Sequence, residues 1–104
     1  MSSFSERERA FENKFAHDAE MQFKAVARRN KRVGLWAAEL LDKTGAEAEA
    51  YAMEVIRTDF EEAGHEVVVR KLVADLGART DEATVRDRME QFLAEAKAEL
   101  MQGD

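Results

Sequence analysis

Residues 19–42 read AEMQFKAVARRNKRVGLWAAELLD, and this stretch decides the fold class. Most of its residues favour helix, and it contains no proline. Gly34 costs about 1 kcal/mol relative to Ala inside a helix, so it allows a bend or a break. The bulky apolar side chains gather toward the end: Val33, Leu35, Trp36, Leu40 and Leu41. The stretch therefore predicts a long helix that buries one face.

Short polar signals divide the rest of the chain into further helices. Thr44, followed three residues later by Glu47, fits a capping box in which the Thr hydroxyl accepts the Glu N–H. Gly64 and Gly77 suit left-handed C-terminal positions, and Thr80 is typical of an N-cap. These limits predict helices near 19–42, 46–63, 66–76 and 81–101.

Apolar residues recur at steps of three and four in each predicted helix. In the second helix they are Ala48, Tyr51, Ala52, Val55, Ile56 and Phe60. The run Val67-Val68-Val69 could form a strand, but the spacing that follows it favours helix. Four helices with short connections predict an all-α fold, a small antiparallel four-helix bundle.

Composition limits the function. The chain has 104 residues, no Cys and a net charge of −6, so it is one domain without disulfides or zinc–thiolate sites. No apolar run approaches the about 20 residues of a membrane span, and the charged start lacks the apolar core of a signal peptide. We expect a cytoplasmic protein that is monomeric when free. The acidic balance argues against nucleic-acid binding.

Residues 1–18 differ from the predicted body, residues 19–104. Residues 1–32 carry eight basic and five acidic groups, whereas the remainder carries eight basic and seventeen acidic groups. An apolar stripe at helical spacing runs through Phe4, Phe11, Phe15, Ala19, Phe23 and Val26. An ordinary bundle would bury such a stripe. Because Leu, Ile and Val are missing before Val26, we predict a mobile, marginally helical segment that folds on a partner.

Residues with catalytic chemistry are scarce, so no enzymatic activity and no metal are predicted. His17 and His65 lack a second ligand at metal spacing, and Glu62-x-x-His65 occurs once. A basic patch is more distinctive: Arg28, Arg29, Lys31 and Arg32, followed by Trp36. It could bind a nucleotide phosphate or an acidic surface, or be a solvated helix turn with Trp36 in the core.

Two runs resemble a known family. AFENKFAHDAEMQFKAVARRNKRVGLWAAELL (Ala10 to Leu41) and AYAMEVIRTDFEEAGHE (Ala50 to Glu66) are similar to the zeta subunit of the alpha-proteobacterial F-type ATP synthase, an inhibitor of ATP hydrolysis. The similarity covers nearly the whole chain and weakens after about residue 70.

The resemblance implies a four-helix body with a mobile N-terminal segment that inserts as a helix into the catalytic head. On this chain the partner-binding residues would be Phe4, Arg7, Glu8, Arg9, Phe11, Lys14 and Phe15. The phenylalanines would be apolar anchors, and the charged residues would contact the partner. The resemblance places the protein at the cytoplasmic face of the inner membrane when bound. It requires no cofactor and implies weak ATP or ADP binding in the bundle.

The alternative function is a nucleotide-binding or nucleotide-sensing helical module that uses the basic patch Arg28–Arg32. The two functions are compatible if a nucleotide tunes docking. An enzymatic or metal-dependent function ranks last.

Overall fold

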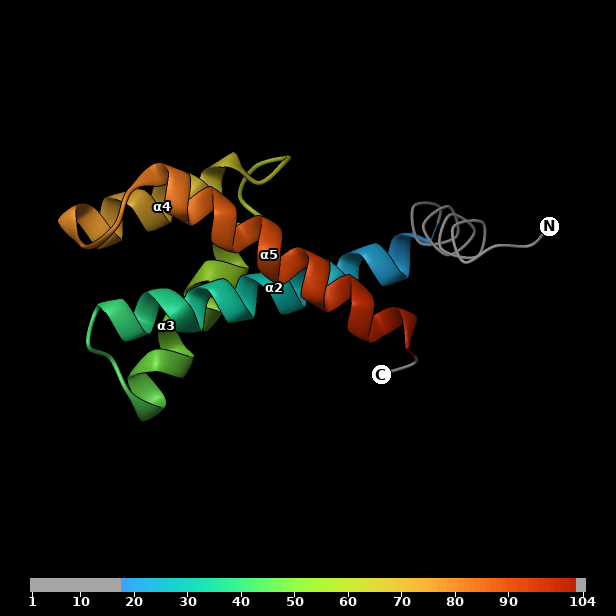
Figure 1. Ribbon diagram of the computed structural model, residues 1–104, viewed down its shortest axis with the longest axis horizontal. Helices are drawn as coiled ribbons and strands as arrows, with labels where there is room; N and C mark the ends of the chain where they lie inside the picture. Colours follow the sequence, from blue (N-terminus) through green and yellow to red (C-terminus); the bar gives the residue numbers. More distant parts are fainter. Residues whose placement is uncertain (1–17, 103–104) are drawn as a thin grey trace.

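A computed structural model describes residues 18–102 of the chain. This part is built from helices and contains no strand (Figure 1). The all-α fold class predicted from the sequence is therefore confirmed. The elements are α2 (Ala19–Leu40), α3 (Gly45–Thr58), α4 (Glu66–Leu76), the short 3-10 helix η1 (Gly77–Arg79) and α5 (Glu82–Met101).

Helix α2 is the central element and packs against both α3 and α5 (Figure 1). It is continuous from Ala19 to Leu40, so Gly34 does not end it. Gly34 is buried against α3, and a Cβ atom placed on it would lie 2.8 Å from Ala52 Cα. The glycine thus lets the backbones of α2 and α3 approach closely.

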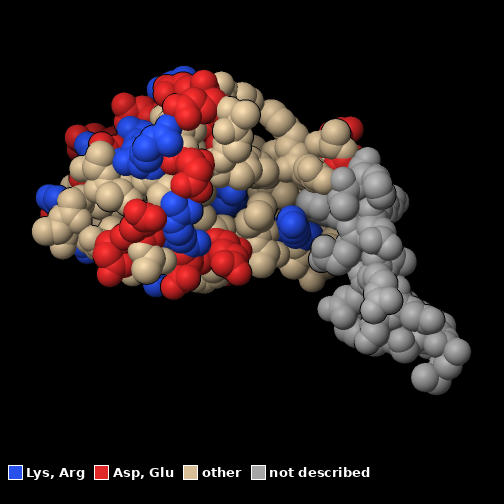
Figure 2. Space-filling model, turned by 90° about the horizontal axis from the view of Figure 1, so that it is seen from above, with Lys and Arg blue, Asp and Glu red and all other residues tan. Residues whose placement is uncertain are grey.

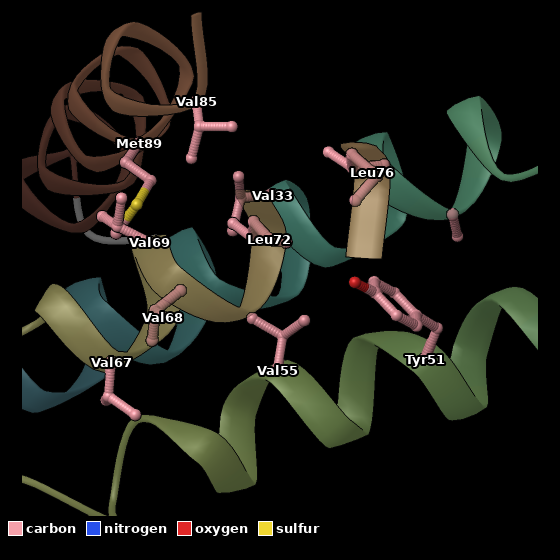
Figure 3. Packing of buried hydrophobic residues seen from close by; sticks show 12 residues of the cluster. Val33, Tyr51, Val55, Val67, Val68, Val69, Leu72, Leu76, Val85 and Met89 are labelled. Atoms are coloured by element: carbon pink, nitrogen blue, oxygen red, sulfur yellow. The ribbon is translucent and has the colours of Figure 1, made fainter. Parts of the chain in front are cut away.

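The main core lies where all four helices meet. Val33 of α2, Val55 of α3 and Leu72 of α4 are fully buried at its centre (Figure 3). Val67, Val68 and Val69 are all buried within α4, so the valine run is helical. The other buried members are Ala37, Ala38, Tyr51, Leu76, Val85 and Met89.

A second, smaller apolar cluster joins the N-terminal half of α2 to the C-terminal half of α5. Ala25 and Ala96 are its buried members, and partly buried side chains surround them. Those side chains are Met21, Leu93, Leu100 and Met101. Because early residues of α2 meet late residues of α5, the two helices run antiparallel.

The helix ends differ in part from the sequence prediction. Asp81, not Thr80, is the N-cap of α5, and its side chain accepts the N–H of Thr84 at 2.8 Å. Thr44 is the N-cap of α3, but its hydroxyl makes no capping bond. The Glu47 N–H donates instead to the Thr44 carbonyl oxygen at 3.1 Å, so the predicted capping box is wrong.

Helix α3 ends at Thr58 instead of near residue 63. The Thr58 hydroxyl donates to the Glu54 carbonyl oxygen at 2.8 Å, and the chain then turns. Phe60 consequently lies in the connection to α4 and is 69% exposed, so its predicted place in the second helix is wrong. Gly64, with φ 78°, lies in the same connection and does not end α3.

The predicted boundary between residues 1–18 and 19–104 stays a prediction, since residues 1–17 lie outside the described part of the chain. Asp18 is the N-cap of α2, with an extended backbone and a side chain that accepts the Met21 N–H at 3.1 Å. None of the helices in residues 18–102 is long and apolar enough to cross a membrane.

Candidate partner-binding site

The predicted partner-binding residues of the N-terminal segment lie outside the described part of the chain. They are Phe4, Arg7, Glu8, Arg9, Phe11, Lys14 and Phe15, and His17 lies outside it as well. Asp18, the first described residue, is the N-cap of α2 and precedes its first turn. The surfaces around this turn are therefore the ones nearest to the segment along the chain.

Two cations of the basic patch contact α5. Arg28 Nη1 lies 3.0 Å from Glu99 Oε1, and Arg32 Nη2 donates to the same oxygen at 2.6 Å. Hydrogen bonding from Arg32 lowers the pKa of Glu99, with Arg28 adding to the effect and desolvation opposing it. Arg32 also lies 3.6 Å from Glu95. Figure 2 shows basic and acidic side chains intermixed on the face of the body that it displays.

Arg29 turns away from these cations and is buried, with 3% of its surface exposed. Its Nη2 lies 2.9 Å from His65 Nδ1 and 3.8 Å from Asp59 Oδ2. Its Nε and Nη2 both donate to Asn30 Oδ1, at 3.1 and 3.0 Å. Burial lowers the pKa of Arg29, and the Asp59 carboxylate partly opposes this shift.

The remaining residues, Lys31 and Trp36, lie apart from these contacts. Lys31 is exposed. Trp36 is half-buried against the main core, with the Arg88 guanidinium 5.9 Å from its ring centroid. The patch is thus spread around α2 rather than gathered on one face. Weak ATP or ADP binding by these residues stays a prediction.

A polar network joins α2 to the connection between α3 and α4. Asn30 Nδ2 donates to Asp59 Oδ2 at 2.9 Å, and His65 Nδ1 lies 3.0 Å from Asp59 Oδ1. The same His65 nitrogen faces Arg29, so it accepts from Arg29 when unprotonated or donates to Asp59 when protonated. Asn30 is 2% exposed, and within residues 18–102 no buried side-chain polar atom lacks a partner.

An apolar groove of about 280 Å³ lies above this network, between α2 and the end of α3. We call it the Phe23–Phe60 groove. Its two rings have centroids 6.0 Å apart and planes tilted by 43°. The lining residues are Phe23, Val26, Ala27, Asn30, Ile56, Asp59 and Phe60.

Sequence reasoning did not identify Phe60 and Asp59 as site residues, because the second helix was predicted to continue through them. Asp59 pairs with Asn30, 29 positions earlier, and no local pattern reports such a contact. A signal for Phe23 was present. The residue belongs to the predicted apolar stripe, and it is 58% exposed on α2.

Metal ligands do not gather in the part of the chain that the structure describes. Within residues 18–102, no three His, Cys, Asp or Glu side chains are placed to hold an ion together. His65 is engaged with Arg29 and Asp59.

Comparisons with known proteins identify relatives of this chain. A family model described as ATPase inhibitor subunit zeta matches residues 1–99. A structure solved by solution NMR is 58% identical to this chain and superposes with a TM-score of 0.73. That match covers 81% of this chain and 99% of the solved one. No curated protein matches.

Proposed function

Because the chain belongs to the ATPase inhibitor subunit zeta family, we propose that it binds the catalytic head of F-type ATP synthase and blocks ATP hydrolysis. In this proposal residues 1–18 insert into the head as a helix. The protein acts by binding and not as an enzyme. Its site of action is the cytoplasmic face of the inner membrane.

The family match carries the proposal, since it extends from residue 1 to residue 99 and so includes both the segment and the body. The charge distribution agrees with this role. The first 32 residues have an excess of basic groups, and the rest of the chain is acidic. A segment that carries three phenylalanines among charged residues can fold on a partner and bury its aromatic rings there.

The first helix of the body has a defined start, and in this proposal the segment extends from it. The Asp18 side chain caps α2, so the body helix has its own N-terminus at Ala19. Among residues 18–102, the buried members of the two clusters lie between Ala25 and Ala96. In this proposal the segment changes its conformation on the partner while these side chains stay packed.

In this proposal, Phe4, Phe11 and Phe15 are the anchors of the segment. Each is a large ring whose burial stabilises a complex by several times the thermal energy. The charged side chains Arg7, Glu8, Arg9 and Lys14 surround them and contact polar groups of the head.

The experiment is a titration of ATP hydrolysis by the isolated catalytic head of the same organism. Three chains are compared: the full chain, a chain that starts at Asp18 and keeps the α2 cap, and the full chain with Phe11→Ala and Phe15→Ala. We expect inhibition by the first chain alone. Equal melting temperatures in circular dichroism, which show that the body stays folded in all three chains, are the control. Inhibition by the chain that starts at Asp18 would contradict the role of the segment, and no inhibition by the full chain would refute the proposal.

A further inference from the structure

The exposed aromatic pair of the body is unusual for a surface that contacts only water. Among the described residues, the exposed large apolar side chains are Phe23, Met53 and Phe60, at 58%, 49% and 69%. Phe23 and Phe60 lie against each other, with ring centroids 6.0 Å apart. Single exposed apolar residues are ordinary, whereas a joined pair that borders a groove marks a contact surface.

The Phe23–Phe60 groove has the chemistry of an apolar site. Its walls include Val26, Ala27 and Ile56, and none of its described lining residues is Lys or Arg. The two polar lining residues, Asn30 and Asp59, are hydrogen-bonded to each other at 2.9 Å. An occupant therefore gains by burying apolar surface, and a nucleotide phosphate would find no cation there.

The groove is held open by contacts beneath it. Asp59 is fixed to α2 by Asn30, and His65 Nδ1 lies 3.0 Å from its second oxygen. The buried Arg29 holds this pair from the other side, 2.9 Å from His65 Nδ1. These contacts fix the base of the groove at Asn30 and Asp59, so an occupant loses little free energy to ordering that part of the groove.

Its place along the chain indicates which partner fills it. Phe23 is five residues after Asp18, about 7.5 Å along a helix. Phe23 and Val26 are also the last members of the apolar stripe that begins at Phe4. A surface that accepts the stripe of residues 4–15 therefore lies within reach of the groove.

We infer that the Phe23–Phe60 groove docks an apolar side-chain cluster on the same ATP synthase head, beside the cleft that takes the N-terminal segment. This inference rests on the proposed function. The groove and the segment form two linked contacts. Once one is made, the other occurs at a high effective concentration, so the pair binds more tightly than the segment alone.

Binding of the full-length chain to the immobilised catalytic head tests this inference. The groove variants are Phe23→Ala and Phe60→Ala, and the matched control is Met53→Ala, an exposed apolar residue outside the groove. Because all three side chains are largely exposed, the variants should keep the melting temperature of the wild type. We expect each groove variant to raise the dissociation constant about tenfold, and the control to change it less than about twofold.

The outcomes separate this inference from the proposed function. Suppose that the wild type binds and inhibits, and that the groove variants have the same dissociation constant as Met53→Ala. The groove is then not a contact, and only the inference fails. If the wild type sediments as a dimer that Phe60→Ala dissociates, the occupant is a second copy and the inference is wrong. If Phe15→Ala shifts groove resonances in the free chain and Phe60→Ala leaves head binding unchanged, residues 1–17 fill the groove instead. A wild type that does not bind the head refutes both.

Discussion

Replacing Gly34 by Ala tests the close contact between α2 and α3. The new Cβ would lie 2.8 Å from Ala52 Cα and 3.2 Å from Ala52 Cβ. Carbon atoms pack best at about 3.5–4.0 Å, so the helices would have to separate by roughly 1 Å. The atom that blocks the methyl group belongs to the backbone of α3, and no side-chain rotation can relieve the contact.

Two effects of opposite sign decide the result. Alanine is favoured over glycine inside a helix by about 1 kcal/mol. Overpacking a filled core costs about 1–3 kcal/mol, and separating the helices also loosens their contacts around Val33 and Val55. We expect Gly34→Ala to lower the free energy of unfolding by up to about 2 kcal/mol, the overpacking cost less the gain in helix propensity.

Urea unfolding followed by far-UV circular dichroism measures this change, provided that the slope with urea is unchanged. Ala94→Gly at an exposed position inside α5 is the control. It makes the reverse exchange where packing plays no part and should cost about 1 kcal/mol. If Gly34→Ala stabilises the protein by as much as Ala94→Gly destabilises it, the close approach does not limit packing and the argument is wrong.

Three further predictions follow from polar contacts. Glu99→Gln should lower stability to urea at neutral pH, and the difference should shrink below about pH 4.3, because a carboxylate whose folded pKa is lowered stabilises only while it is ionised. Asp81→Ala should lower the melting temperature by a few degrees and Thr80→Ala by much less, because Asp81 caps α5. Burial and a hydrogen bond to a carboxylate raise the pKa of Tyr51, so wild-type stability should fall above about pH 10 and that of Tyr51→Phe should fall less.

Each of these has a direct check. If the stability to urea of the wild type and of Glu99→Gln changed equally with pH, the contacts of Glu99 would not stabilise the fold. If Thr80→Ala lowered the melting temperature more than Asp81→Ala did, Thr80 would be the N-cap of α5, as predicted from the sequence. The chain has one tyrosine, so an absorbance titration reports Tyr51 alone. Ionisation in the folded state near pH 10 would contradict the buried hydrogen bond to Asp75.

Local sequence patterns were sufficient for the fold class. Apolar spacing at steps of three and four, with Thr44 and Gly77 between the periodic stretches, reports interactions within a few residues. The end of α3 depends on more distant contacts. Asp59 interacts with Asn30 across the fold, and Phe60 lies over a groove that exists only after α3 has packed on α2. The apolar spacing of the second helix continues as far as Phe60, so it gives no sign that α3 ends at Thr58.

The basic patch illustrates a different limit. Arg28 and Arg32 are four residues apart and so share a helix face, whereas Arg29 is rotated by about 100°. Adjacent cations in a helical sequence therefore face different neighbours. A projection of residues 28–36 onto a helix would have separated them. Their partners, Glu99 and Asp59, still required the tertiary structure.

The small cluster between α2 and α5 implies that stability is graded along the molecule. Only Ala25 and Ala96 are fully buried there, whereas the main core contains many more buried side chains. Local opening should therefore begin at Met21 and Leu100 and leave the rest folded. In amide hydrogen exchange, the first turns of α2 and the last turns of α5 should exchange earliest. The first turns of α2, which follow residues 1–17 in the chain, can thus change conformation on a partner at small free-energy cost. The main core keeps its structure.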